Sequence, residues 1–154
     1  MEQTAITILN AHRTMAISTV RPDGWPQTTI VGYANEGFDI FFLILRSSQK
    51  FINISRDDRI SVAVGAEPQS LDQVEAMYAA ARAVEVADPR QRDYAWRLLV
   101  QRHPNLADFE LPDGSEAALM RATCEHVSVV DYTRGFWRRE DLAPGETRTV
   151  NQVG

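Results

Sequence analysis

The chain has 154 residues, of which 44% are hydrophobic and 24% charged, as expected for one globular domain that folds without disulfides or metals. Its net charge of −5 argues against nucleic-acid and anionic-membrane partners, although it leaves room for a local basic pocket. The single cysteine cannot form an internal disulfide, no apolar run is long enough for a bilayer, and the first residues lack a signal-peptide pattern. We therefore expect a cytoplasmic domain over residues 1–142 and a flexible tail over residues 143–154.

The first part of the chain predicts a helix and then a β-hairpin. Thr4–His12 places its apolar side chains on one face, as in a short amphipathic helix. Met15–Val20 and Gln27–Tyr33 are rich in β-branched residues, and the proline and glycine of Arg21–Pro26 suit a tight turn between them. A second turn is predicted at Asn35–Gly37.

The following stretch predicts a strand, a short helix and another strand. Phe38–Leu45 is a continuous apolar run, typical of a strand buried on both faces. Ser47 or Ser48 is placed to cap the helix, because either hydroxyl can accept a hydrogen bond from a free amide of its first turn. Ile60–Val64 alternates as the next strand. Short strands in this order predict an antiparallel barrel or sandwich.

Lys50 lies in the first turn of this short helix, where the helix dipole disfavours a cation and favours an anion. It is also the only lysine in the sequence. Free amides, serine hydroxyls and an ammonium group can together hold a phosphate, so this helix start is a candidate phosphate site. The alternative interpretation is a solvated surface lysine in a chain that otherwise prefers arginine.

The second half of the chain contains one ambiguous segment, one clear helix and a final strand. The alanines of Val74–Val86 favour a helix, whereas a strand there would extend the sheet. Asp88 is a predicted N-cap, with Pro89 at the first helical position, and His103–Pro104 ends that helix. Ala122–Tyr132 predicts the last strand. Strict alternation would place Cys124, His126, Ser128 and Val130 on one face and Glu125, Val127, Val129 and Asp131 on the other.

The sequence shows no set of residues for acid–base, nucleophilic or metal chemistry. The three histidines lie in separate predicted elements without metal-ligand spacing, so no metal site is expected. Hydrolase, P-loop and dinucleotide-binding motifs are missing, and Cys124 is interpreted as a small core residue. A flavin would suit such a chain, because it supplies its own reactive ring.

The order of these features resembles the FMN-binding split β-barrel family, the pyridoxamine 5′-phosphate oxidase-like proteins. The residues that carry the resemblance are the hairpin Met15–Tyr33, the block Phe41–Val64 with its Ser-x-Lys, and Val129–Phe136, which looks like the end of the small general-stress-protein branch. The resemblance implies an α+β fold that is mainly β, a split antiparallel β-barrel with Val74–Val86 as a strand. It also implies a homodimer with FMN bound at the interface.

The resemblance further implies cofactor-binding residues. Ser48 and Lys50 match the phosphate ligands, in agreement with the dipole argument. In the family, an arginine near the position of Thr28 and a hydroxyl side chain near that of Ile44 often help to hold the phosphate. This chain departs from the family at both positions, so Arg46 is the candidate that would replace them in holding the phosphate. Trp137 lies where family members often bring an aromatic from the partner subunit to the flavin; its alternative role is an interface or core aromatic. The segment beside the isoalloxazine edge matches Thr28, Thr29, Ile30 and Val31, and the segment beside the ribityl chain matches Leu43, Ile44 and Leu45.

These assignments predict a flavoprotein oxidoreductase that acts on an unidentified small molecule. One alternative is a non-catalytic protein that binds or sequesters flavin, deazaflavin F420 or haem. Another is a structural dimeric barrel that has lost its ligand. The chain lacks the C-terminal Arg-Leu-x-Pro ending of true pyridoxine-phosphate oxidases, so oxidation of vitamin B6 is not expected.

Overall fold

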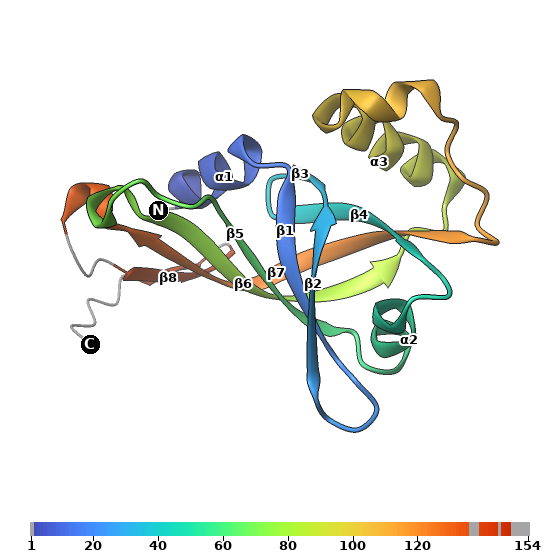
Figure 1. Cartoon of the computed structure of the whole chain (residues 1–154), viewed down its shortest axis with the longest axis horizontal. Coiled ribbons are helices and arrows are strands. Elements are labelled where there is room, and N and C mark those ends of the chain that lie inside the picture. Colours follow the sequence, from blue (N-terminus) through green and yellow to red (C-terminus); the bar gives the residue numbers. More distant parts are fainter. Residues whose placement is uncertain (1, 136–138, 145, 149–154) are drawn as a thin grey trace.

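A computed structural model describes residues 2–135, 139–144 and 146–148, and shows a curled antiparallel sheet flanked by helices (Figure 1). The strands are β1 (Thr14–Val20), β2 (Pro26–Gly32), β3 (Ala34–Glu36), β4 (Asp39–Leu45), β5 (Arg59–Gly65), β6 (Glu75–Glu85), β7 (Ala117–Asp131), β8 (Arg139–Ala143) and β9 (Glu146–Arg148). The helices are α1 (Glu2–Ala11), α2 (Gln49–Arg56) and α3 (Pro89–Arg102), with 3-10 turns at Leu71–Gln73, Pro104–Asp108 and Tyr132–Arg134. No helix in the described part of the chain combines the length and apolarity needed to cross a membrane.

The sheet forms a barrel that stays open along one line. Its strand order is β2-β1-β5-β6-β7-β4-β3, and every pair of neighbours is antiparallel. Curling brings β2 back to within 8 Å of β4 between Cα atoms, yet no ladder hydrogen bonds join these two strands. This opening is called the split below. The predicted α+β fold with a split antiparallel barrel is confirmed.

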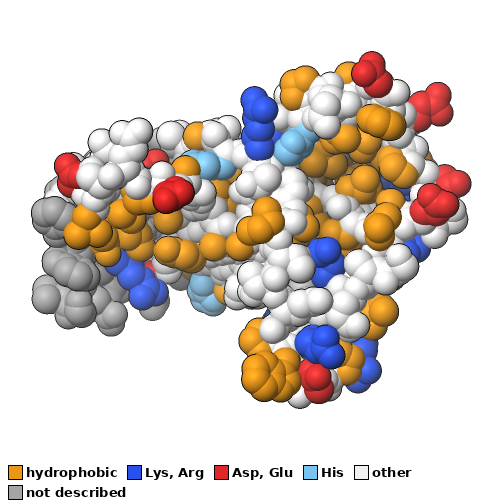
Figure 2. Space-filling view, viewed as in Figure 1, with side chains coloured by type: hydrophobic (Ala, Val, Ile, Leu, Met, Phe, Trp, Pro, Cys, Tyr) orange, Lys and Arg blue, Asp and Glu red, His pale blue; other side chains and the backbone are white. Residues whose placement is uncertain are grey.

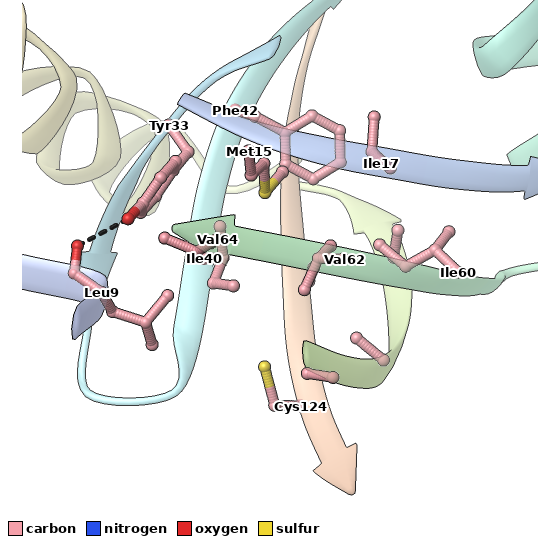
Figure 3. Close-up of a cluster of buried hydrophobic side chains, with 14 of the residues drawn as sticks. Leu9, Met15, Ile17, Tyr33, Ile40, Phe42, Ile60, Val62, Val64 and Cys124 are labelled. Carbon is pink, nitrogen blue, oxygen red and sulfur yellow. Dashed lines mark hydrogen bonds between the residues drawn. The ribbon is translucent and has the colours of Figure 1, made fainter. Parts of the chain in front are cut away.

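One hydrophobic core fills the inside of the curled sheet, and α1 closes it. The apolar face of α1, made by Ala5, Ile8 and Leu9, is 0% exposed. The Tyr33 hydroxyl donates a hydrogen bond of 2.6 Å to the Leu9 carbonyl oxygen (Figure 3). Side chains from β1, β4 and β5 converge on the same interior. Helix α1 is therefore held by apolar burial and by a hydrogen bond to one of its last carbonyl groups.

A second, smaller core lies between α3 and the outer face of β4, and it fixes the end of α3. Arg102 donates to the carbonyl oxygens of Leu9 (3.1 Å) and His12 (2.9 Å), and to Oδ1 of Asn35 (2.9 Å). These bonds tie the last turn of α3 to the C-terminal end of α1 and to β3. The buried members of this core are Ala34, Phe41, Val86, Ala95, Leu99 and Leu119.

The ambiguous alanine-rich segment is a strand, as the family resemblance implied. In β6 the side chains of Met77, Ala79, Ala81 and Ala83 are buried, and those between them point outward. Helix α1 contacts β6, and small side chains on the inner face of a strand let a helix approach closely. Packing across the sheet therefore overrides the helix propensity of alanine.

The last long strand differs from its prediction in length and in its faces. β7 begins at Ala117, earlier than the predicted start at Ala122. The prediction missed these residues because Ala117–Met120 is buried on both faces and shows no alternation of polar and apolar side chains. A β-bulge at Glu125 puts Cys124 opposite Ala81 and His126 opposite Ala80. The prediction of strict alternation is therefore wrong: Cys124 shares the buried face with Val127 and Val129.

Three short strands were not predicted. β3 occupies residues expected to form a turn, because Asn35 is buried and pairs opposite Ile40, which moves the reversal to Gly37 with φ 57°. β8 pairs with β7 and β9, and β9 lies within the stretch where a flexible tail was expected. The tail itself stays a prediction.

A buried amide seats α2 against the hairpin of β1 and β2. Asn53 is 0% exposed, and its Nδ2 donates to Oγ1 of Thr19 (3.0 Å) and to Oε1 of Gln27 (3.2 Å). Nε2 of Gln49 donates to Oδ1 of Asn53 (2.8 Å). Both ends of the amide are thus satisfied, which fixes α2 relative to β1 and β2.

Two buried acids keep their protons more strongly than usual. Burial raises the pKa of the Cys124 thiol from 9.0 to about 12, and the Asp39 carboxylate adds to this in the same direction. Burial also raises the pKa of Tyr33 from 10.0 to about 12, although Arg102 opposes the shift. A thiol that is protonated in the folded state but ionised in the unfolded chain destabilises the fold above its unfolded pKa.

We expect Cys124 to lower the free energy of unfolding by about 1 kcal/mol between about pH 8 and pH 10, and to have no such effect below pH 8. Urea denaturation of the wild type and of Cys124→Ala across this window measures the effect. The variant loses buried atoms and is less stable at every pH, but its stability should fall less steeply with pH. Parallel pH profiles for the two proteins would contradict a buried, protonated thiol.

Candidate functional site

Helix α2 begins beside the split, and Ser48 caps it. Ser48 has extended backbone angles (φ −74°, ψ 149°), and its Oγ accepts a hydrogen bond from the Phe51 amide at 3.3 Å. The same hydroxyl donates to the Leu45 carbonyl oxygen at 2.6 Å. The structure thus selects Ser48 over Ser47 as the cap and ties the helix start to the end of β4.

Lys50 is the cation of this helix start that has no counter-charge. Its side chain is half-buried, and it makes no hydrogen bond or ion pair with any residue that the structure describes. The first turn of α2 contains no acidic residue. An ammonium group at the positive end of a helix dipole is unfavourable by itself, and a bound anion would relieve this repulsion.

Arg46, by contrast, has a counter-charge and a hydrogen-bond acceptor within the chain. Its Nη2 lies 2.5 Å from Oε1 of Glu85, its Nε donates to the Gly114 carbonyl oxygen, and its guanidinium lies 5.2 Å from the centre of the Phe51 ring. These contacts tie the end of β4 to β6 and to the loop before β7. A phosphate-binding role for Arg46 stays a prediction, with its charge already balanced by Glu85.

The β2 segment predicted to touch a cofactor presents two different faces. Thr28 and Ile30 point outward, with Ile30 69% exposed, and the Thr28 hydroxyl hydrogen-bonds to Ser18 at 2.6 Å. Thr29 and Val31 point toward the core. Oγ1 of Thr29 is buried without a hydrogen-bond partner among the described residues. Because β1 is the one described strand that pairs with β2, the backbone of the other edge of β2 faces the split.

The predicted β4 residues do not form one common surface. Ile44 is 4% exposed and belongs to the main core, whereas Leu43 packs into the second core under α3. Leu45 is 59% exposed at the end of the strand. Trp137 lies outside the described residues. Of the three predicted β4 side chains, therefore, only Leu45 is exposed.

A cavity of about 220 Å³, not predicted from the sequence, lies where β2, β4 and the end of α3 meet. His103 donates from Nε2 to the Tyr33 carbonyl oxygen at 2.9 Å, which leaves a lone pair on Nδ1 of the neutral ring. A Cβ atom on Gly32 would lie 3.2 Å from Cε1 of His103. An isolated glycine within a predicted strand indicates that another part of the chain approaches the strand closely. Gly32 was the one signal in the sequence for this cavity. The cavity is lined by Gly32, Leu43, Leu99, His103, Asn105 and Leu106.

Within the described residues no group of three or more His, Cys, Asp or Glu side chains lies close enough to hold a metal. Next to the split the described residues offer the ammonium group of Lys50 without a partner among them, the start of α2, an edge of β2 that pairs with no described strand, and a cavity whose walls include Gly32 of β2 and Leu43 of β4. Such a surface can bind a ligand with a negatively charged end and a planar apolar body.

A curled antiparallel sheet left open between β2 and β4 defines the chain as a split β-barrel protein. The chain belongs to the pyridoxamine 5′-phosphate oxidase family, because the sequence profile of that family matches residues 1–131. This confirms the predicted family. A comparison with curated proteins gives no significant match.

Solved structures of the same fold include proteins of different binding properties. A heme binding protein from Mycobacterium smegmatis is similar with a TM-score of 0.80 and 16% identity, covering 94% of this chain and 58% of that chain. This chain thus spans less than two thirds of that protein. General stress protein 26 from Bacillus anthracis has a TM-score of 0.69 and 20% identity, covering 92% and 97%. A FAD-binding protein from Mesorhizobium loti has a TM-score of 0.66 and 20% identity, covering 84% and 91%.

Substituting the two neighbouring serines tests the start of α2. Ser48→Ala should lower the free energy of unfolding by about 1 kcal/mol, because the Phe51 amide loses its capping acceptor. Ser47→Ala is the matched control and should change it by less than about 0.5 kcal/mol. Urea denaturation measures both. A larger loss for the Ser47 variant would show that the helix begins elsewhere.

Proposed function

We propose that this chain binds FMN at the split and uses it to oxidise or reduce a small molecule. The observation that carries the proposal is the ammonium group of Lys50, which has no partner among the described residues, at the capped start of α2, a helix that Asn53 joins to Gln27 of β2. Family membership supports the redox role, since the family is named after an oxidase, pyridoxamine 5′-phosphate oxidase. The similarity to a FAD-binding protein is in line with a flavin.

The start of α2 would hold the phosphate of FMN. The first-turn amides of a helix point at an anion placed on the helix axis, and Lys50 would add the charge that the dipole alone lacks. Arg46 would contribute indirectly, because its bonds to Glu85 and Gly114 hold the strand end on which Ser48 is anchored. The phosphate end would thus need one cation and a rigid helix start.

The flavin ring would lie along the split. The unpaired edge of β2 offers backbone N–H and C=O groups, which match the alternating donors and acceptors of the pyrimidine half of a flavin. The buried hydroxyl of Thr29 without a partner is an orphaned polar group in this segment. The cavity under α3 would give a small substrate a place beside the ring, with Nδ1 of His103 as a proton acceptor.

The proposed site would be completed by a second copy of the chain. Ile30 (69% exposed) and Leu45 (59% exposed) flank the split on β2 and β4. A second copy that covered these two side chains would remove their apolar surface from water, which favours association. A homodimer that covers them would also exclude water from the ring, which strengthens polar contacts to the cofactor.

A bound flavin supplies the electron or hydride transfer, so the protein need only bind and orient the reactants. This accounts for the lack of an evident acid–base pair. A non-catalytic role is the second candidate, and the similarity to a heme binding protein favours it. An imidazole at the cavity wall is a ligand type that haem iron accepts, so haem or deazaflavin F420 could be bound without turnover.

The visible absorption spectrum of the protein, as purified and after incubation with FMN and gel filtration, tests the cofactor. Flavin bands that co-migrate with the protein would support the proposal, and a Soret band would support haem. Failure to retain added FMN would contradict it. Reduction of the bound flavin by NADH or NADPH, followed by oxidation by an added acceptor, would distinguish an enzyme from a flavin store.

Substitution of Lys50 tests the phosphate end. Lys50→Ala should weaken FMN binding by about 1–3 kcal/mol, the range for losing a charge-assisted hydrogen bond to a phosphate. Arg56→Ala, which removes an exposed cation from the last turn of the same helix, is the control and should leave the affinity nearly unchanged. Titration followed by quenching of FMN fluorescence gives the dissociation constants. Equal constants for wild type and the Lys50 variant would remove Lys50 from the site.

A further inference from the structure

The cavity of about 220 Å³ under α3 has apolar walls from three elements. Leu43 comes from β4, Leu99 from α3, and Leu106 from the 3-10 turn that follows α3. Gly32 and Asn105 also line the cavity and are exposed, so it opens to solvent beside them. In the space-filling view, apolar side chains gather on the surface between α3 and β4 (Figure 2). An apolar cavity of roughly 150 Å³ holds one benzene molecule, so this cavity has room for a single ring with a small substituent.

His103, which also lines the cavity, uses only one of its two ring nitrogens within the described part of the chain. The helix ends here, since the His103 amide donates to the Leu99 carbonyl oxygen at 2.8 Å and Pro104 follows. Nε2 of His103 lies 2.9 Å from the Tyr33 carbonyl oxygen, which has no proton to give, so Nε2 carries the hydrogen of the neutral ring. Nδ1 is then a lone-pair acceptor, and no described residue donates a hydrogen bond to it.

The cavity offers no charge to a ligand. None of its lining side chains is that of an Asp, Glu, Lys or Arg. Arg102, which precedes His103 in the chain, directs its guanidinium to the carbonyl oxygens of Leu9 and His12 and to Oδ1 of Asn35. Moving an ionised group into apolar surroundings without a counter-charge costs far more than moving a neutral group. The cavity therefore selects neutral molecules.

We propose that this cavity binds a neutral one-ring molecule that carries one O–H or N–H group, and that this group donates a hydrogen bond to Nδ1 of His103. The inference rests on the proposed function and names the class of its substrate. The three leucine side chains remove the apolar ring from water, which drives binding. Gly32 of β2 and Leu43 of β4 both line the cavity, so the bound ring lies next to the split, where the flavin is proposed.

Nδ1 of His103 also supplies the selectivity. A ring without a donor takes water away from Nδ1 and gives it no partner in return, which costs free energy. A ring whose polar group is only an acceptor leaves the same lone pair unfilled. The exposed side chain of Asn105 makes no hydrogen bond with any described residue and stays in contact with water, so it adds little to this selection.

Phenol and anisole, which share a ring but differ in the donor, test this hydrogen bond. At pH 8 histidine side chains are ordinarily neutral, and phenol, like a tyrosine side chain, keeps its proton. Titration followed by ligand-observed NMR gives the dissociation constants. Phenol should bind about fivefold more tightly than anisole, the effect of one hydrogen bond, and the benzoate anion no more tightly than anisole. Equal constants for phenol and anisole, tighter binding of benzoate, or no binding of phenol would overturn the proposal.

Three variants locate the bound ring. His103→Phe keeps a ring in place but removes the acceptor, so the preference for phenol over anisole should vanish. His126→Phe, at an exposed position of β7, is the matched control and should retain the preference. Leu106→Phe keeps the imidazole but fills the cavity, and it should weaken binding of both ligands by about fivefold or more. A preference that survives in a folded His103 variant, or affinities unchanged in the Leu106 variant, would overturn the site.

The outcomes for this cavity are separate from those for the flavin. A protein that retains FMN but binds phenol no better than anisole would contradict the substrate class and leave the proposed flavin site standing. A protein that fails to retain FMN but shows the preference for phenol would contradict the proposed function and support the cavity as a site for neutral donors.

Discussion

The hydrogen bonds of the buried Asn53 amide determine where α2 lies, and most of the candidate site follows from that position. A helix of eight residues is too short to be stable on its own, so tertiary contacts must hold it. Asn53 supplies them from inside the barrel by bonding to Thr19 and Gln27 on the two strands of the hairpin. Ser48 fixes the other end of the helix to β4. The start of α2, with Lys50 in its first turn, is thereby placed on the line where the barrel fails to close.

The structure balances most of its charges and polar groups; of those without a partner among the described residues, Lys50 and Thr29 lie in the elements next to the split, whereas Nε of Arg121 lies on β7. Arg46 is paired with Glu85, and Arg102 satisfies carbonyl groups at the end of α1. Lys50 has no such partner among the described residues, Oγ1 of Thr29 is buried without one, and one edge of β2 lacks a neighbouring strand. Unsatisfied groups of this kind lower stability and are tolerated where a ligand or partner completes them. The same reasoning makes the split, and not the well-packed interior, the place to expect function.

Local signals in the sequence were sufficient for β1, β2, β4 and β5, for the cap of α3 and for the cation at the start of α2. Asp88 caps α3 as predicted, accepting from the Gln91 amide, because a cap depends on residues three apart in the chain. What could not be predicted depends on contacts between distant residues. The bulge at Glu125, the pairing of Arg46 with Glu85 and the approach of His103 to Gly32 all join separate elements. The family resemblance settled β6, where alanine content alone left helix and strand open.

The central claim is that the start of α2 is an anion site at the split of the barrel. A crystal structure of the protein soaked with FMN tests it most directly. The account predicts the phosphate on the first-turn amides of α2, within hydrogen-bond distance of Nζ of Lys50, with the ring along the free edge of β2. A phosphate bound elsewhere, with Lys50 pointing into solvent, would contradict it.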